Sequence, residues 1–369
     1  MNFIHIADLH LDGKAKTSGG DSEKRRQEIL NAFVKMIDYI KNKNINYLFI
    51  AGDLYEHKYI RDTTIEILIE QFKRIPNTNI FITPGNHDPY VVNSVYDRFD
   101  FPENVHIFKE MEIFETKDAN IFGVGFIDFF PRKSANYSSI KPIKNGKKNI
   151  LIAHTDISSL DNEYDKEIYK LTKKGFDYVA MGHIHMGNYD KNSNILYSGS
   201  FAKYNFKSAK YDKAGAIYGE FTQYGLKTEL IQFDNTKYIE YVLYITNIRS
   251  VASLILDLNH LNFKSNEIVR IILEGEKNFD VNKKYIMENI NNSNIVQIVD
   301  NTSLKLEYKK IKEEVSLIGI YLKNADNLIE GLKEKRKYAK DEIEKEEIDK
   351  KIKQVEEAIV LVLEEINNI

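Results

Sequence analysis

The chain has 369 residues, 43% of them hydrophobic, a length and composition that suit two or three domains, each with its own core. The absence of cysteine excludes disulfides, thiolate metal sites and cysteine nucleophiles. A net charge of −3 excludes a protein that coats nucleic acid through charge alone, so nucleic-acid contacts would be local or shared with a partner. No apolar run is long enough to span a membrane and no signal peptide is recognisable, which predicts a cytoplasmic protein.

The first part of the chain alternates between short apolar runs and amphipathic stretches. Runs at 3–7, 47–51 and 79–83 predict buried strands. Residues 22–41 and 62–75 carry apolar side chains at helical spacing, so each predicts a helix with one face toward a sheet. This alternation predicts parallel βαβ units.

The next part, up to about residue 235, predicts a second sheet. Short apolar runs at 105–108, 111–115 and 120–126 predict its first strands. Further strands are predicted at 149–153 and 176–181, followed by closing antiparallel strands at 195–197, 214–221 and 226–233. The predicted architecture is two packed sheets flanked by helices.

Asp, Asn and His residues follow five of these strands, each at the carboxyl end. Ligand sites gather at this edge in open α/β sheets. Mixed nitrogen and oxygen donors suit divalent transition-metal ions, and the inventory is sufficient for two of them. The candidate ligands are Asp8, His10, Asp53, Asn86, His154, His183 and His185.

Spacing and chemistry predict roles for several of these residues. One residue separates Asp8 from His10, so both side chains would lie on the same side of an extended segment and reach one ion. Asp53 can bridge two cations because its carboxylate has two oxygens. Asn86 offers a neutral oxygen, whereas His87 points elsewhere and is predicted to act on the substrate.

The pattern changes after residue 235. Strands at 238–246 and 266–274, with helices at 249–259 and 282–292, predict a small α/β domain. From residue 305 the chain is charged and helical, and two out-of-phase heptad stripes predict two helices joined near 338–344. Residues 358–363 are apolar nearly all round, so we expect a second surface to cover them. The stripe predicted to bind a partner is Ile348, Ile352, Val355, Ile359, Val362 and Ile366.

Two loops are rich in lysine. One holds Lys141, Lys144, Lys147 and Lys148, a pattern typical of a solvated loop. The other closely follows the last His motif, which favours a contact with DNA; its residues are Lys203, Lys207, Lys210 and Lys213.

The motifs Asp8-x-His10, Gly52-Asp53, Gly85-Asn86-His87-Asp88, His154 and Gly182-His183-x-His185 occur in the order found in the calcineurin-like metallophosphoesterases. Over roughly residues 1–235 the chain resembles this family. Within it, the chain is most similar to DNA double-strand-break repair nucleases of the SbcD type, especially their YhaO-like branch. The residues that carry this finer resemblance are Phe3 to Asp12, Ala51 to Tyr55 and Gly85 to Pro89.

The resemblance implies a four-layer αββα sandwich over 1–235 and a cap domain over 236–304 that helps select DNA, while the heptad stripes predict the helical hairpin over 305–369. The resemblance also implies that the hairpin binds the coiled coil of an SbcC-type ATPase, that the metals are two Mn²⁺ ions, and that the protein is a homodimer.

The resemblance further assigns roles to the site residues. His87 contacts the phosphate or protonates the leaving oxygen, and Asp88 orients the His87 ring. The implied ligands are Asp8, His10, Asp53 and His185 for the first ion, and Asp53, Asn86, His154 and His183 for the second.

The chain departs from its relatives three residues after the bridging Asp, where many of the repair nucleases carry a His. Glu56 stands there and His57 follows, so no role transfers to either residue. The Tyr197-Ser198-Gly199-Ser200 stretch stands where many relatives have Pro-Gly-Ser, which would alter only the stiffness of that loop.

Three functions remain open: a two-metal DNA nuclease, a phosphoesterase acting on small nucleotides or phosphoproteins, and a regulatory protein that binds metal without turnover. The metal ligands do not separate the first two. The cap and the C-terminal heptads favour the nuclease, because a small-molecule hydrolase does not need them. The presence of His87 argues against the regulatory protein.

Overall fold

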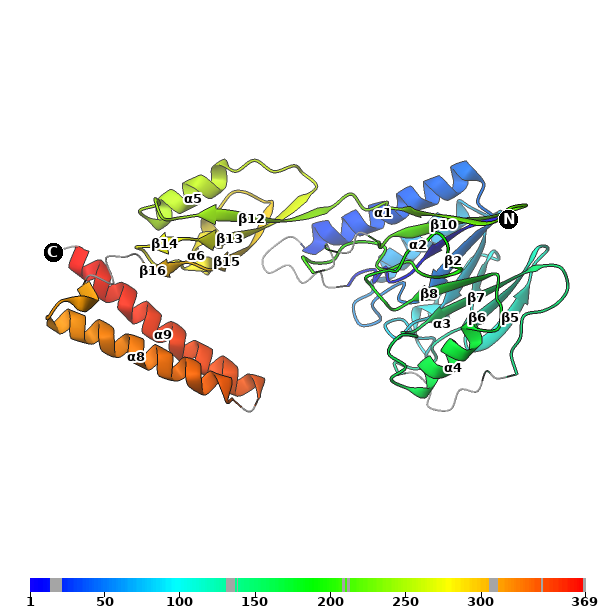
Figure 1. Ribbon diagram of the computed structural model, residues 1–369. Coiled ribbons are helices and arrows are strands. Elements are labelled where there is room, and N and C mark those ends of the chain that lie inside the picture. Colours follow the sequence, from blue (N-terminus) through cyan, green and yellow to red (C-terminus); the bar gives the residue numbers. More distant parts are fainter. Residues whose placement is uncertain are drawn as a thin grey trace. The chain divides into compact units, whose positions relative to one another are not determined.

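A computed structural model describes residues 1–13, 22–130, 137, 139–207, 210, 213–304, 311–339 and 341–367 (Figure 1). The chain forms two compact units that divide between Lys237 and Tyr238. We call the N-terminal part the first unit and the C-terminal part the second unit. The three-domain division expected from the sequence places another boundary at residue 305, and that boundary stays a prediction.

A six-stranded sheet forms the first half of the first unit, in the order β11-β10-β1-β2-β3-β4. Its parallel centre follows from the βαβ alternation, because α1 and α2 return the chain to the same edge. β10 and β11 join it as antiparallel strands. The bounds are β1 Asn2–Ile6, α1 Ser22–Lys43, β2 Tyr47–Ala51, α2 Asp62–Lys73, β3 Asn79–Thr83, α3 Val95–Arg98, β4 Val105–Ile107, β10 Ala216–Thr222 and β11 Gly225–Ile231.

A five-stranded sheet forms the other half, in the order β5-β6-β7-β8-β9. Two expectations were wrong here. β4 joins the first sheet, parallel to β3, and β9 pairs in parallel with β8 instead of closing the sheet antiparallel. Both strands have only three residues, too short for periodicity to indicate a partner. The bounds are β5 Met111–Glu115, β6 Ala119–Val124, β7 Lys148–His154, α4 Glu163–Thr172, β8 Tyr178–Gly182 and β9 Ile195–Tyr197.

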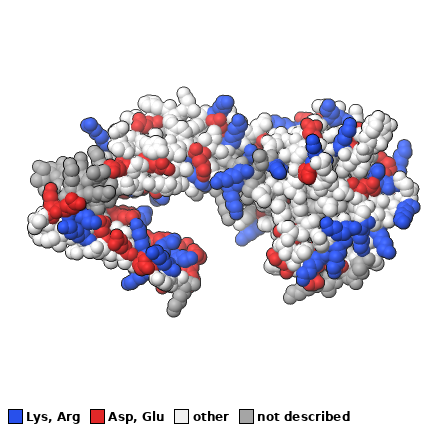
Figure 2. Space-filling model, viewed as in Figure 1, with Lys and Arg blue, Asp and Glu red and all other residues white. Residues whose placement is uncertain are grey.

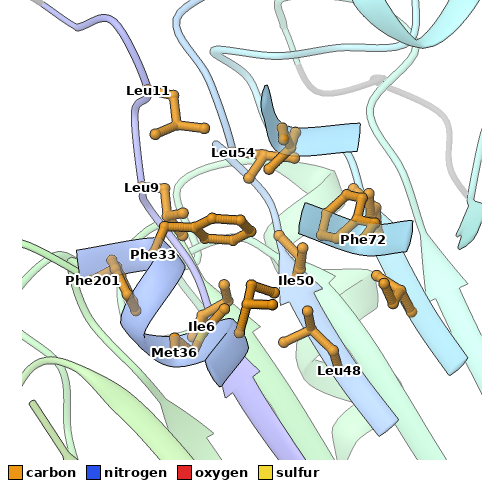
Figure 3. Packing of buried hydrophobic residues seen from close by; sticks show 14 of the residues in the cluster. Ile6, Leu9, Leu11, Phe33, Met36, Leu48, Ile50, Leu54, Phe72 and Phe201 are labelled. Atoms are coloured by element: carbon orange, nitrogen blue, oxygen red, sulfur yellow. The ribbon is translucent and has the colours of Figure 1, made fainter. Parts of the chain in front are cut away.

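Alternating side chains of the central strands build the layers. On β2, Leu48 and Ile50 pack under α1 and α2 (Figure 3). Phe49 and Ala51 of the same strand enter the core between the sheets. On β7, Ile152 enters the same inter-sheet core and its neighbours face α4. Strands buried on both faces have continuous apolar runs in their sequence, as these strands do. The expected αββα sandwich is confirmed.

The second unit begins with a small α/β sheet in the order β12-β13-β15. The sequence-based expectation missed β15, which pairs in parallel with β13 and follows an Asn-rich turn. A two-stranded sheet of β14 and β16 accompanies it. The bounds are β12 Lys237–Tyr244, α5 Val251–His260, β13 Glu267–Glu274, β14 Glu276–Lys277, α6 Lys283–Asn289, β15 Ile295–Asp300 and β16 Ser303–Leu304.

Two long helices, α8 Leu317–Lys337 and α9 Glu342–Asn367, form the expected C-terminal hairpin. Ser316 caps α8 by accepting a hydrogen bond from the Gly319 N–H. Leu322, Ala325 and Ile329 of α8 pack against α9, and charges of both signs cover the outside (Figure 2).

The stripe expected to bind a partner instead closes the hairpin. Ile348, Ile352 and Ile359 are buried against α8, and Val355 packs on the same cluster. Val362 is half-buried, and the Ile366 side chain lies outside the described residues. A heptad stripe first covers its own hairpin partner, and this intramolecular contact corrects the expectation. Among the described helices, none is both long and apolar enough to cross a membrane.

Candidate metal centre

The candidate ligands meet because the two sheets present the carboxyl ends of their parallel strands at one rim. Asp8 follows β1, Asp53 follows β2 and Asn86 follows β3, while His154 ends β7 and His183 follows β8. A parallel bridge between Ala7 and Ser200 connects strand ends of the two halves here. Residues as far apart in the chain as Asp8 and His185 therefore share one site.

The backbone at this rim is turned sharply. Asp8, His10, Asp53 and His183 have positive φ angles of 53°, 44°, 53° and 87°. The expectation that Asp8 and His10 lie on an extended segment was therefore wrong. Left-handed conformations of non-glycine residues are costly and cluster at functional sites, where surrounding contacts hold them. Here the Asp8 N–H donates to the Gly52 carbonyl (3.1 Å) and the His10 N–H donates to the Asp53 carbonyl (2.9 Å).

Two glycines make room for the cluster. A Cβ at Gly52, whose φ is +85°, would lie 2.2 Å from His154 Nδ1. A Cβ at Gly85 would lie 2.3 Å from Asp53 Oδ1. Any larger residue at either position would displace a candidate ligand.

One group of donors converges around Asp8, His10 and His185. His10 Nε2 and His185 Nε2 lie 3.1 Å apart, and His185 Nε2 lies 3.6 Å from Asp8 Oδ1. Potential ligand atoms of all three residues lie within 4.8 Å of one another. Asp8 is fully buried, so its carboxylate has exchanged water for these side chains.

Asp53 faces both His10, which belongs to the group just described, and His154, around which a second group of donors lies. Its Oδ2 lies 3.7 Å from His10 Nε2 and 3.2 Å from His154 Nε2. Asn86 Oδ1 lies 3.2 Å from the same nitrogen of His154. His183 packs its ring against the His154 ring, with centroids 5.1 Å apart. Among the described residues, its ring nitrogens do not converge closely with two other His, Asp or Glu donors, as those of His10, His154 and His185 do.

The imidazoles of His10 and His154 are held by their outer nitrogens. His154 Nδ1 lies 2.8 Å from the Ala51 carbonyl, and His10 Nδ1 lies 2.8 Å from Glu56 Oε1. A hydrogen bond at one ring nitrogen fixes the ring and turns the other nitrogen toward a metal. Both Nε2 atoms therefore face the acidic centre.

The centre is built to hold positive charge. Burial opposes charged imidazoles, yet the hydrogen bond to Glu56 together with Asp53 and Asp8 raises the pKa of His10 to about 9. Burial likewise opposes charge on His154, but Asp53 raises its pKa to about 9. Burial raises the pKa of Asp8 to about 6. Cations placed among these groups would stabilise the carboxylates and displace the imidazole protons.

The comparisons with known proteins agree with this geometry. The profile of the calcineurin-like phosphoesterases matches residues 1–187, which is half of the chain. The chain belongs to that family. Its members are metal-dependent hydrolases that bind two metal ions, and the donor set described above suits this chemistry.

Several curated relatives share about a quarter of their residues with the chain. The DNA double-strand break repair protein Mre11 of Saccharolobus solfataricus is 25% identical over 50% of this chain and 49% of its own length. The uncharacterized metallophosphoesterase YhaO of Bacillus subtilis is 28% identical over 50% and 48%. A component of the nuclease SbcCD from Staphylococcus epidermidis is 28% identical over 58% and 64%. The chain thus spans about half the length of the first two.

Glu56 is the site residue for which the sequence predicted no role. Its two oxygens lie 2.8 Å from His10 Nδ1 and 3.0 Å from His87 Nδ1. Burial opposes ionisation, but these two histidines lower the pKa of Glu56 to about 2. The hydrogen bond with Glu56 raises the pKa of His87. The signal available in the sequence was position, because Glu56 lies three residues after Asp53.

Asp88 does not contact the His87 ring, which corrects the expected role. Its oxygens accept hydrogen bonds from the N–H groups of Asp53 (2.9 Å), Leu54 (2.7 Å) and Gly85 (2.6 Å). Tyr96 also donates to it, at 2.7 Å. Burial, and next the charge of Asp53, raise the pKa of Asp88 to about 7. Asp88 therefore ties together the two loops that carry Asp53 and His87.

The two basic loops differ in position. Lys148 begins β7, at the opposite end of the strand from His154, and pairs with Asp177 (2.9 Å). The loop with Lys203 lies beside the site, because the ring of Tyr204 is 6.0 Å from that of His10. Lys207, Lys210 and Lys213 are exposed there, while residues 208–209 and 211–212 lie outside the described part.

Proposed function

We propose that the chain is a two-metal phosphodiesterase that cleaves DNA. The observation that carries the hydrolytic part is Asp53, which faces both His10 and His154 at 3.7 and 3.2 Å. A carboxylate in this position serves two cations and offsets their repulsion. Support for DNA comes from two relatives, one a DNA double-strand break repair protein and the other a component of the nuclease SbcCD.

We assign Asp8, His10, Asp53 and His185 to one ion, and Asp53, Asn86, His154 and His183 to the other. Mixed nitrogen and oxygen ligands suit manganese, iron or zinc, and the family resemblance favours manganese. When bound, two such ions neutralise phosphate oxygens and lower the pKa of a water molecule, so that it attacks as hydroxide near neutral pH.

The chain itself supplies the proton for the leaving oxygen. Glu56 holds His87 Nδ1, so His87 Nε2 remains available to the substrate, and the side chain is 45% exposed. The contact with Glu56 raises the pKa of His87, which favours the protonated ring that a general acid needs. A positioned acid of this kind contributes typically about 10²–10⁴-fold to the rate.

We also infer that the C-terminal hairpin docks on the coiled coil of an SbcC-type ATPase. The apolar stripe that faces away from the hairpin core supports this. Leu317, Tyr321 and Leu328 recur along α8 and are 87%, 38% and 53% exposed. Leu361 on α9 is 63% exposed. Apolar side chains in a row at coiled-coil spacing suit a further helix.

Nuclease activity tests the proposal directly. The full chain with Mn²⁺ is assayed on linear duplex DNA, on single-stranded DNA and on bis-p-nitrophenyl phosphate. We expect hydrolysis of DNA, lost in His87→Ala. Turnover of the small diester without turnover of either DNA would instead favour a phosphoesterase for small nucleotides.

A further inference from the structure

A loop that contributes no candidate ligand runs alongside the His87 loop. The Phe126 N–H donates to the Pro84 carbonyl (3.0 Å), and the Tyr90 N–H donates to the Phe126 carbonyl (2.7 Å). The Phe126 ring packs on the His154 ring, with centroids 6.0 Å apart. Residues that follow Phe126 therefore emerge beside the metal centre.

His57 connects this loop to the catalytic residue. Its N–H donates to the His87 carbonyl at 3.0 Å. Its ring meets the Phe129 ring edge to face, with centroids 5.2 Å apart and planes at 75°. A single residue, His57, thus links the Phe129 ring to His87.

Phe129 and Phe130 are both open to solvent, at 42% and 77% exposure. A single exposed apolar side chain is ordinary. Here two exposed phenylalanines follow each other in the chain, and the first of them packs on His57, whose N–H binds the His87 carbonyl. We call His57, Phe129 and Phe130 the aromatic platform.

A cation adjoins His57 in the chain. Lys58 follows His57, is exposed, and has its Nζ 5.7 Å from the centroid of the Tyr59 ring. It makes no ion pair with any residue that the structure describes. A lysine in the position after His57, together with the exposed rings of the loop that packs on His57, matches a nucleotide, which offers a phosphate and a flat base together.

We propose that the aromatic platform stacks an unpaired nucleobase of the strand being cleaved, and that Lys58 contacts the phosphate backbone of that strand. The inference rests on the proposed DNA cleavage and specifies the substrate as a single-stranded or frayed end. Stacking uses the π face that all bases share, so the site would tolerate any sequence.

A thermodynamic cycle tests the proposal by binding alone. Dissociation constants are measured with Mn²⁺ in the His87→Ala background for a single-stranded oligonucleotide and for a strand of equal length without bases. We expect the bases to tighten binding by about tenfold, and Phe130→Ala to remove that preference. Phe130→Trp should restore it and Phe130→Leu should not.

A matched control comes from Tyr224, which is 84% exposed in the turn between β10 and β11. β10 runs antiparallel to β1, with Glu220 opposite Asn2, so this turn lies at the far end of the sheet from Asp8. Tyr224→Ala should keep the base preference, and both Ala variants should keep the wild-type circular dichroism spectrum.

The outcomes separate the two proposals. Equal base preference with and without Phe130 would overturn the platform, while DNA cleavage by the unmutated chain would still support the proposed function. Failure of the unmutated chain to bind or cleave any DNA, with hydrolysis of the small diester intact, would overturn both. Quenching of 2-aminopurine fluorescence on binding, lost in Phe130→Ala, would confirm stacking independently.

Discussion

The metal rim and the C-terminal hairpin place their charged residues in opposite ways. At the rim, Asp8, Asp53 and Asp88 are buried and each is held by named partners. Along the hairpin, pairs such as Arg336 with Asp349 lie at the surface, with side chains 45% and 49% exposed. Buried charges depend strongly on their partners, whereas exposed ion pairs contribute little.

The comparison teaches where single substitutions matter. A buried carboxylate that loses its partner keeps the desolvation penalty, so changes at the rim should be severe and local. On the hairpin, water replaces a lost partner. The predictions below test this difference, and they run from the rim to the hairpin.

Asp53→Asn should have the largest effect. The amide is a weaker ligand and does not offset the repulsion of two cations, so we expect both ions to be lost. Activity should then fall by more than about 10⁴-fold, which is the most that the loss of a general acid alone would typically cost. Elemental analysis measures the metal, and full occupancy of either site at micromolar metal would contradict the bridge.

His87→Ala should remove turnover while the protein keeps two ions. The residue neighbours Asn86 but lies outside the assigned ligand sets, so the rate should fall by about 10²–10⁴-fold. Metal content and kcat are measured on the same preparation. Loss of an ion in this variant would mean that His87 is a ligand.

Glu56→Gln should reduce activity or metal affinity by about 10–100-fold, the usual effect of removing a partner of a metal-bound His. The amide holds His10 and His87 less strongly, and its loss of charge removes the support for a protonated His87. Metal titration and the pH profile of kcat separate the two contributions. Glu66→Gln, on the exposed side of α2, is the matched control and should change neither.

Acid should destabilise the first unit through His5. Burial lowers the pKa of His5 to about 3, and its Nδ1 lies 2.9 Å from the Tyr178 hydroxyl. An unfolded His takes up a proton below about pH 6.5, whereas the folded one stays neutral, so stability falls as the pH drops from about 6.5 toward 3.

The slope should reach about 1.4 kcal/mol per pH unit. His5→Gln should flatten it in denaturant unfolding of metal-free protein, and equal slopes would contradict the assignment. The segment 305–369 contains no His, so its helices should not share this component.

Leu328→Glu combined with Leu361→Glu should have the smallest effect on catalysis. Both side chains are more than half exposed, so folding and hydrolysis of a small diester should stay within about twofold of the unmutated chain. Co-purification with an SbcC-type coiled-coil fragment should end. Retained binding would mean that the ATPase docks elsewhere.

Much of the site was predictable because the ends of the strands can be recognised in the sequence. Each candidate ligand follows an apolar run, and parallel strands bring such ends to one edge. The roles of Glu56 and Asp88 were not predictable in the same way. Glu56 meets His87 across 31 positions, and Asp88 meets the backbone of Asp53 across 35, so both contacts depend on how loops cross in space.

The heptad stripe of α9 shows the same limit. Its spacing predicted an apolar face, and that face exists. Spacing alone did not show that Ile348, Ile352 and Ile359 would turn toward α8 and leave Leu361 outside. Periodicity identifies a face to be covered, but it does not identify what covers it.

The sequence by itself determined the αββα layers, the order of the ligands and the two C-terminal helices, because burial period and strand-end chemistry are local properties of the chain. The tertiary structure decided which sheet received β4 and β9, that the ligand backbone is left-handed, and that Glu56 holds His87. Those features depend on contacts between distant segments, and no single segment encodes them.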